Sequence, residues 1–283
     1  MEKRANDLYF QDNYSQALKL YKRIALYDSS DYILSMIANC QMELGHFKQA
    51  KEYYLSVIMR TPCREKESFE SQEWTYCHKL YAIYMKEGNC SKALEYLKLA
   101  DKCYRVRRIC SMGSFHDALR LNYEYAVCYD SLGQIDSAIT RLTPYMFFIP
   151  QRYEAKQYTP IFDYYLKTLY RRYSKKNLCE ALEQAIDTLQ HECTTDNDQL
   201  DDSTNMIFFN IDCSFNFLGC KVYEYAGGIE VDSLQSMIPD YLTREYFQSY
   251  VRRCRVYKAL FAVKDENRST IPKRRRSAKA PRK

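Results

Sequence analysis

An alanine recurs at wide and regular intervals along this chain, and that recurrence limits the folds the chain can adopt. Intervals of 33, 43, 45 and 43 residues separate Ala17, Ala50, Ala93, Ala138 and Ala181. A glycine lies five residues before three of these alanines, at Gly45, Gly88 and Gly133. Because glycine commonly follows the last turn of a helix, each glycine predicts a turn between two helices.

The side chain four residues after each of the first four alanines is large. These residues are Tyr21, Tyr54, Leu97 and Leu142. Residues four apart share one face of a helix, so each alanine and its large neighbour are expected to pack on the preceding helix. A helix pair with one apolar stripe cannot bury that stripe alone, whereas stacked pairs can. The pattern therefore predicts an α-solenoid.

This pattern resembles the tetratricopeptide repeat (TPR), with a small residue in the first helix, a turn glycine followed by an aromatic residue, an alanine in the second helix and a terminal proline. Pro62 and Pro150 occupy the last position. The resemblance covers residues 5–28, 31–62, 74–105, 119–150 and, more weakly, 162–190. The family's signature tryptophan is missing from every unit. Three spacings also exceed the usual repeat of roughly 34 residues, which longer first helices, for instance over 65–86, would absorb.

We therefore predict an all-α fold, a right-handed α-solenoid of TPR-like helix pairs with a C-terminal capping helix and a disordered basic tail. The predicted regions are helical repeats over 1–193, an acidic polar loop over 194–205, an irregular helix pair with the capping helix over 206–264, and the tail over 265–283. Few glycines and prolines, seven of each, are consistent with a helical chain.

The region after the acidic loop is predicted to contain helices over 204–225 and 232–240, with Gly227 and Gly228 at their turn. Thr243 then opens the capping helix. Its apolar face is expected to hold Tyr246, Tyr250, Cys254, Tyr257 and Phe261, and its solvent face Arg252, Arg255 and Lys258. A terminal helix of a repeat array needs one apolar face and one face toward water.

The positive charge is concentrated in the tail. The chain carries a formal charge of +6, and its end contributes Lys273, Arg274, Arg275, Arg276, Lys279, Arg282 and Lys283 without an acidic residue, so the rest is close to neutral. Such a cluster can neutralise nucleic-acid phosphates, and in a eukaryotic cell it resembles a nuclear import signal. A solubilising terminus or a contact with an acidic partner, including the loop over 194–205, are the other interpretations.

Twelve cysteines are present, but no signal peptide precedes the first helix, so a reducing, cytoplasmic location is expected, or a nuclear one in a eukaryote. Cys40 and Cys128 share one repeat position beside the packed face, which predicts buried thiols. No C-x-x-C motif and no histidine spacing indicates a metal site. No apolar run reaches 18 residues, so no membrane-spanning segment is expected. We also expect no cofactor and no metal.

The TPR resemblance also implies a groove, lined by first-helix positions that face away from the second helix. Transferred residue by residue, this surface consists of Asn6, Tyr9, Tyr32, Met36, Asn39, Met42, His78, Lys79, Met85, Tyr123, Glu124, Val127 and Tyr170. Tyrosine and methionine suit apolar side chains, and asparagine can bond a peptide backbone. The alternative is that 28 tyrosines in the chain make any surface look aromatic.

TPR domains that hold the C-terminal carboxylate of chaperones use lysine, asparagine and arginine at set positions. Here those positions are Glu2, Asn6, Met36, Thr75 and Lys79, of which only Asn6 fits well, so that function is not expected. No phosphate-binding loop, serine elbow or zinc motif indicates an enzyme. The first hypothesis is a non-enzymatic adaptor or scaffold that binds a partner protein or peptide in the groove. The alternatives are a nucleic-acid-associated regulator that uses the tail and a peptide-sensing TPR regulator, and self-association remains open.

Overall fold

The computed structural model describes residues 1–60, 73–103, 111–147, 158–196, 206–232 and 243–262, and the chain divides into two compact units. Unit 1 comprises Met1–Arg172 and unit 2 comprises Tyr173–Lys283. Each unit has its own buried core and is described by itself.

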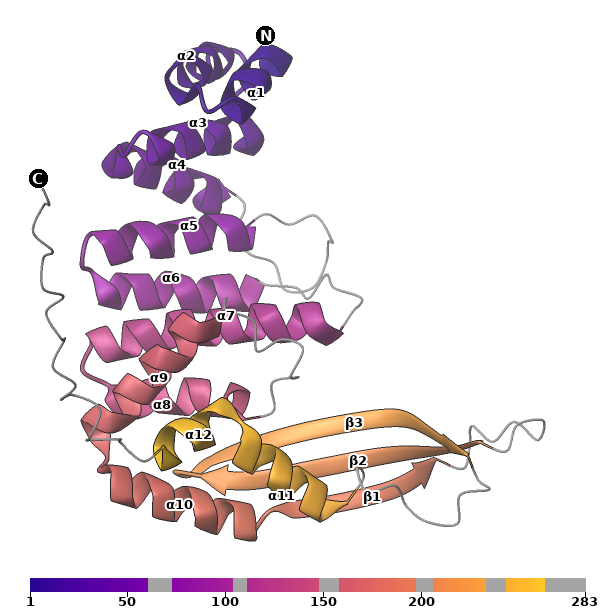
Figure 1. The fold of residues 1–283 in the computed structure, drawn as a ribbon. Helices are drawn as coiled ribbons and strands as arrows, with labels where there is room; N and C mark the ends of the chain where they lie inside the picture. Colours follow the sequence, from indigo (N-terminus) through magenta and orange to yellow (C-terminus); the bar gives the residue numbers. More distant parts are fainter. Residues whose placement is uncertain (61–72, 104–110, 148–157, 197–205, 233–242, 263–283) are drawn as a thin grey trace, which may run out of the picture. The chain divides into compact units, whose positions relative to one another are not determined.

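Unit 1 is a stack of helix pairs (Figure 1). Each helix packs on the next one along the chain, from α1 to α9. Their bounds are α1 Glu2–Phe10, α2 Tyr14–Ile24, α3 Asp31–Glu43, α4 Phe47–Arg60, α5 Glu73–Lys86, α6 Cys90–Cys103, α7 Ser111–Ser131, α8 Ile135–Leu142 and α9 Thr159–Arg172, with a short 3₁₀ turn at Thr143–Tyr145. The predicted helical-repeat solenoid is confirmed for these residues, and the long α7 fits the expected lengthening of first helices.

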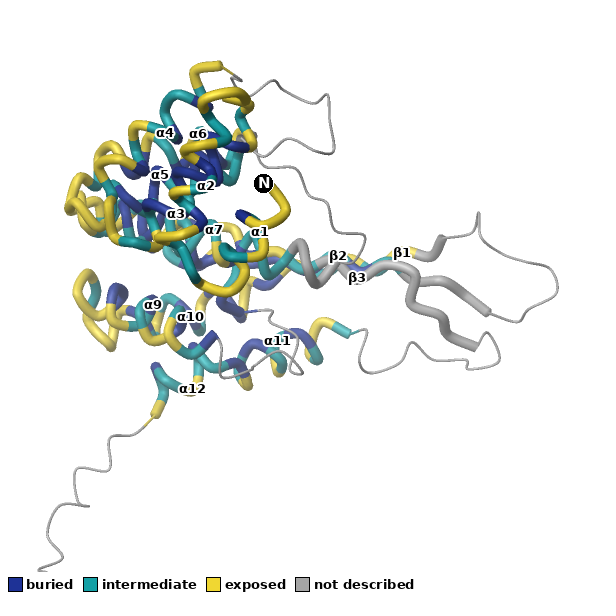
Figure 2. Tube along the Cα trace, turned by 90° about the horizontal axis from the view of Figure 1, so that it is seen from above, coloured by how far each residue is buried: buried dark blue, intermediate teal, exposed yellow. Residues whose placement is uncertain are grey.

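The alanine ladder is the inner face of this stack. Ala17, Ala50, Ala93 and Ala138 are each 0 % exposed, and the large residues four positions later are buried beside them. Figure 2 shows this burial along the inner sides of the helices, with exposed residues at their outer sides and turns. The ladder therefore packs each second helix on its first helix, as its spacing predicts.

The turn inside each helix pair repeats one backbone geometry. Gly45, Gly88 and Gly133 have φ values of 78°, 72° and 75°. In each case the next N–H donates to the carbonyl five residues earlier, as from His46 to Gln41 at 2.8 Å. This is the left-handed helix ending that glycine adopts at little cost.

In the turn between α1 and α2, Asp12 occupies the position that glycine occupies in the other turns. Replacing Asp12 with glycine should stabilise unit 1. Its φ is 59°, and Asn13 N–H donates to the Leu8 carbonyl at 2.8 Å, so the geometry matches the other turns. Asp12→Gly should raise the free energy of unfolding by about 0.5–1 kcal/mol, because the left-handed conformation costs a residue that has a Cβ. The reverse change, Gly45→Asp, should lower it by a similar amount, as measured by urea denaturation. A loss in Asp12→Gly would mean that the bond from the Tyr14 hydroxyl to Asp12, 2.5 Å long, matters more than the backbone.

Unit 2 contains a three-stranded antiparallel sheet in the order β1-β2-β3, where the sequence predicts helices. Its strands are β1 Gln190–Asp196, β2 Met206–Phe217 and β3 Cys220–Asp232, and its helices are α10 Lys175–Asp187, α11 Arg244–Arg253 and α12 Arg255–Phe261 (Figure 1). The predicted helices over 204–225 and 232–240 are therefore wrong for residues 206–232, and Gly227 and Gly228 lie within β3 rather than at a helix turn. The all-α prediction does not extend to this sheet.

The sequence of β2 alternates apolar and polar residues, which explains why it forms a strand. Ile211, Cys213, Phe215 and Phe217 are buried, and the residues between them are Asp212, Ser214 and Asn216. Alternation of apolar and polar side chains places the apolar set on one face of a sheet. Leu218 and Gly219, both at positive φ, form the two-residue turn into β3, so the segment is a β-hairpin.

The predicted capping helix is two helices. Thr243 caps α11 as expected, and its hydroxyl accepts the Tyr246 N–H at 3.3 Å, but the chain becomes extended at Cys254. The break changes which side chains are covered: Phe247, Val251, Val256 and Leu260 are buried with Cys254, not the predicted tyrosines. Arg252, expected in solvent, bonds Glu183 of α10 at 3.0 Å. Of the predicted apolar face, Cys254 is buried, and Tyr246, Tyr250, Tyr257 and Phe261 are only partly buried.

The boundaries between regions also differ from the prediction. Unit 2 begins at Tyr173, so the predicted fifth helix pair is divided, and α10 is grouped with the strands. Ala181, the last ladder position, is only partly buried. Residues 194–196, predicted to be loop, end β1. Pro62, Pro150, the extension of α5 over 65–72, the rest of the acidic loop and the tail over 265–283 lie outside the described residues.

Candidate partner-binding surface on the first helices

The first two repeats connect their helices through a tyrosine and an asparagine. The Tyr21 hydroxyl of α2 donates to Asn6 Oδ1 of α1, and Tyr32 of α3 donates to the same oxygen at 3.1 Å. In the next repeat, Tyr54 of α4 donates to Asn39 Oδ1 of α3 at 2.6 Å. Burial raises the pKa of Tyr21 and of Tyr54, which keeps both hydroxyls as donors.

These bonds change the role predicted for the two asparagines. The carboxamide oxygen of Asn6 accepts two hydrogen bonds from inside the protein, and that of Asn39 accepts one. The Asn39 Nδ2 group lies 3.7 Å from Met36 Sδ, a weak acceptor. Donation from the amide nitrogens is what these residues could still offer a partner.

The third and fourth repeats replace this polar pair with an apolar one. The positions that match Asn39 and Tyr54 are Ala82 and Leu97 in the third repeat, and Val127 and Leu142 in the fourth. Both members change together, so no repeat leaves a buried hydroxyl opposite an apolar side chain, which would cost free energy. The bonds of Asn6 with Tyr21 and of Asn39 with Tyr54 thus belong to packing within the repeats, whereas the bond from Tyr32 to Asn6 joins the first two repeats.

A charged cluster joins α5 and α7 on the predicted surface. His78 Nε2 lies 2.8 Å from Glu124 Oε2, and the two side chains are 20 % and 14 % exposed. Arg120, 66 % exposed, reaches the other oxygen of Glu124 at 3.3 Å. The His78 ring also lies 6.4 Å from Trp74 and 5.3 Å from Tyr81, between ring centroids.

Several further predicted residues contact neighbouring first helices. Tyr123 of α7 meets Tyr164 of α9 edge-on, with centroids 5.3 Å apart, and the Cys128 thiol lies 3.6 Å from Met85 Sδ. The bond from Tyr32 to Asn6 joins α3 to α1, whereas Tyr9 of α1 packs edge-on against Tyr14 of the second helix α2, with centroids 5.4 Å apart. First helices α1 and α3, α5 and α7, and α7 and α9 thus contact one another through predicted residues.

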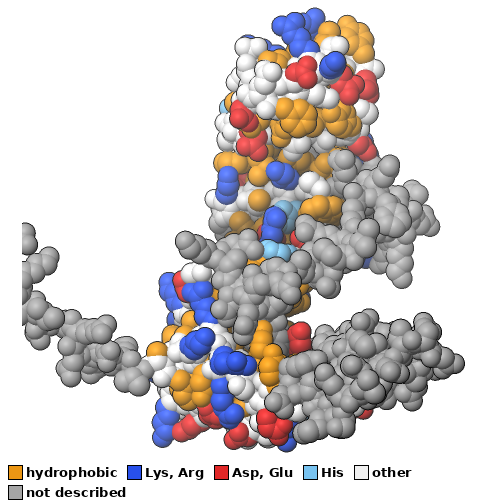
Figure 3. Space-filling view, turned by 45° about the vertical axis from the view of Figure 1, so that its right-hand side comes forward, with side chains coloured by type: hydrophobic (Ala, Val, Ile, Leu, Met, Phe, Trp, Pro, Cys, Tyr) orange, Lys and Arg blue, Asp and Glu red, His pale blue; other side chains and the backbone are white. Residues whose placement is uncertain are grey.

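The residues predicted to line the groove differ in their solvent exposure. Tyr32 and Tyr170 are 41 % and 45 % exposed, whereas Met36 is 9 % exposed and serves the core. Asn6, Tyr9, Asn39, Met42, His78, Lys79, Met85, Tyr123, Glu124 and Val127 are intermediate. Figure 3 shows hydrophobic side chains gathered on one face of the repeats, with single basic and histidine side chains among them.

Sequence reasoning missed Arg120, Trp74, Tyr81 and Tyr164. Arg120 had a usable signal, because it lies four residues before Glu124 on the same helix. The contact of His78 with Glu124 spans 46 residues, and no local pattern could reveal it. Cys40 and Cys128 are buried as predicted, and burial raises the pKa of each thiol to about 12, which makes them poor nucleophiles.

The described residues hold no group of three histidine, cysteine or acidic side chains arranged for a metal ion. Among these same residues, none of the helices has the length and apolar character needed to cross a bilayer. The basic tail residues Lys273, Arg274, Arg275, Arg276, Lys279, Arg282 and Lys283 lie outside the described part of the chain.

No protein-family model matches this sequence, and no curated protein matches it. Three solved structures show a similar fold. An ArsTM double mutant of MamA RS-1 is 15% identical over 64% of this chain and 88% of its own, with a TM-score of 0.47. A putative kinesin light chain of Podospora anserina with nearly identical TPR-like repeats is 18% identical over 65% and 90%, also at 0.47. TTC0263, a TPR protein of Thermus thermophilus, is 18% identical over 60% and 100%, at 0.30.

At such identities and TM-scores these similarities carry no argument about function. The assignment of the repeats rests on the geometry of unit 1 itself: four helix pairs in sequence, a fully buried alanine in each second helix and a left-handed turn residue five positions before it. The helix pairs of unit 1 are TPR-like repeats, and this assignment does not include the sheet of unit 2.

Proposed function

We propose that this protein is a non-enzymatic scaffold that binds a partner protein or peptide on the first-helix surface of unit 1. We define this surface by its outward-facing members, Tyr32, His78, Lys79, Arg120, Tyr123 and Tyr170. The observation that carries the proposal is that the first helices α3, α5, α7 and α9 present large aromatic and basic side chains that are exposed (Tyr32, Arg120 and Tyr170) or partly exposed (His78, Lys79 and Tyr123). The alanine face, by contrast, is fully buried within the helix pairs. Tyrosine and arginine are the side chains most useful at the centre of interfaces.

The surface suggests which partner it would accept. On α3 it presents the Tyr32 ring, next to the carboxamide of Asn6 on α1 to which Tyr32 bonds, and these groups suit apolar side chains and backbone carbonyls. Toward α5 and α7 it presents Lys79 and Arg120, with one carboxylate, Glu124, already held by His78. A segment that is apolar at one end and acidic at the other would complement both regions.

Selection of displayed peptides on the full chain, followed by affinity measurement on paired variants, tests this proposal. The surface variant combines Tyr32→Ala and Arg120→Ala, which are 41 % and 66 % exposed and lie outside the buried core, so the fold should persist. The control combines Glu52→Ala and Lys98→Ala on the exposed faces of α4 and α6. We expect selected peptides to bind the surface variant at least about tenfold more weakly, roughly 1.4 kcal/mol, and the control unchanged. Equal affinities for the two variants would contradict the proposal.

A further inference from the structure

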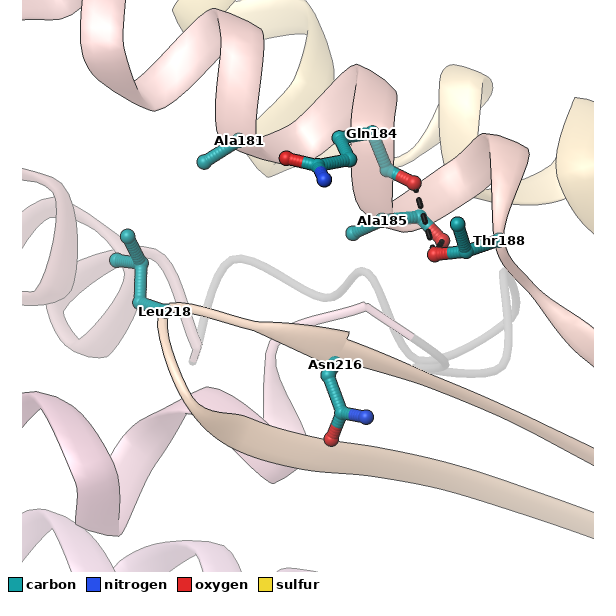
Figure 4. A pocket seen from close by; sticks show the side chains of 6 residues that line it. All are labelled: Ala181, Gln184, Ala185, Thr188, Asn216 and Leu218. Carbon is teal, nitrogen blue, oxygen red and sulfur yellow. Dashed lines mark hydrogen bonds between the residues drawn. The ribbon is translucent and has the colours of Figure 1, made fainter.

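A pocket in unit 2 lies at the fifth position of the alanine ladder (Figure 4). Helix α10 supplies Ala181, Gln184 and Ala185, the residue after its end supplies Thr188, and the β2–β3 hairpin supplies Asn216 and Leu218. The volume is about 260 Å³. In the first four repeats the ladder alanine is fully covered, whereas Ala181 is partly exposed and forms part of the pocket wall.

The polar side chains of the pocket are uncharged: one hydroxyl and two carboxamides. Thr188 uses its hydroxyl on its own helix, donating to the Gln184 carbonyl at 2.8 Å. The remaining side-chain polar groups are two carboxamides, Gln184 from the helix and Asn216 from the strand, and both residues are exposed. A carboxamide both donates and accepts, which matches the N–H and C=O of a peptide and offers nothing to neutralise an ion.

Leu218 is an unusual residue for the turn that it occupies. Its φ is 52° and Gly219 follows at 78°, so the hairpin has the two-residue turn in which both central residues are left-handed. Asparagine or aspartate normally precedes the glycine there, because a leucine is strained in this conformation. The leucine gives the turn no advantage, but it gives the pocket an apolar wall opposite Ala181 and Ala185.

We propose that this pocket binds an extended segment of a partner polypeptide through one leucine-sized apolar side chain and its adjoining peptide groups. The side chain would lie between Leu218 and the two alanines, and the carboxamides of Gln184 and Asn216 would bond the backbone. The volume holds one such side chain with its peptide group but not a bulky cofactor. The site lies within unit 2 and is independent of the first-helix surface.

Methyl NMR on the full chain, with labelled alanines, tests the pocket with capped amino acids. N-acetyl-leucinamide should shift the Ala181 and Ala185 methyl signals in a saturable manner in the millimolar range. N-acetylglycinamide, which lacks the side chain, and free leucine, which carries both charges, should bind at least tenfold more weakly. Equal shifts from all three probes, or none from N-acetyl-leucinamide, would overturn the proposal.

Two variants separate binding from folding. Ala181→Leu fills the pocket from a partly exposed position, and Leu218→Asn supplies the residue that the turn prefers while removing the apolar wall. Both should lose the response to N-acetyl-leucinamide at Ala185, while the melting temperature of Leu218→Asn should be unchanged or higher. Retained binding in Leu218→Asn would refute the proposed role of the wall. Either result leaves the first-helix surface of unit 1 untested, so the two proposals fail separately.

Discussion

Replacing Ala50 by leucine is expected to destabilise unit 1 by about 3 kcal/mol, because the ladder position has no room for a larger side chain. Ala50 is 0 % exposed and belongs to a cluster with Leu34 and Ala38 of α3, Tyr54 of its own helix α4 and Leu80 of α5. Three added carbons would push α3 and α4 apart. In a stack where each pair is stabilised by its neighbours, the loss should also weaken adjacent repeats. Urea denaturation, followed by circular dichroism and by fluorescence of Trp74, would measure it.

The same substitution at Ala181 is the matched control. Ala181 occupies the equivalent ladder position but is partly exposed beside a pocket, so Ala181→Leu should change the free energy of unfolding by no more than about 0.5 kcal/mol. The contrast depends only on what covers the alanine, since the residue, the helix type and the substitution are the same. A loss at Ala50 as small as that expected at Ala181 would show that the ladder does not mark packing, and would undermine the repeat assignment of unit 1.

Most of unit 1 could be predicted from sequence because its rules are local. Gly45, Gly88 and Gly133 fix the turns, and the alanines five residues later fix which face of the second helix is buried. Both features lie within one helix pair, so a single repeat contains the information for its own shape. The surface was harder to predict, because the contacts of Tyr32 with Asn6 and of His78 with Glu124 join different repeats.

Unit 2 was mispredicted for two physical reasons. The segment from Ile211 to Phe217 has a period of two, but its aromatic and aliphatic content is equally compatible with a buried helix when only apolar length is considered. The hairpin was not predicted because leucine, which occupies position 218 of the turn, is not a residue typical of turns. In the last helices, the break at Cys254 shifted the buried set from tyrosines to Phe247, Val251, Val256 and Leu260, and no proline or glycine marks that break.

Glu224 should make the stability of unit 2 depend on pH between about 4.5 and 7. It lies on β3 directly opposite Cys213 of β2, on the buried side of the sheet, and Cys213 is 0 % exposed. Burial raises the pKa of Glu224 from 4.5 to about 7 in the folded protein. The folded state therefore holds this proton more tightly than the unfolded chain does. The stabilising effect is complete below pH 4.5, declines as the pH rises, and is lost above about 7.

Glu224→Gln keeps the shape of the side chain and removes the charge, so it should stabilise unit 2 at pH 8 by about 2 kcal/mol and have little effect at pH 4.5. One pKa unit corresponds to about 1.4 kcal/mol, and the partial exposure of Glu224 reduces the full value. Hydrogen exchange of β2 and β3 amides at both pH values, corrected for intrinsic rates, would measure the gain where it arises. Glu192→Gln on β1 makes the same chemical change at an exposed position and should have no such pH dependence. A gain from Glu224→Gln that is equal at pH 4.5 and pH 8 would mean that the cause is packing and not the buried charge.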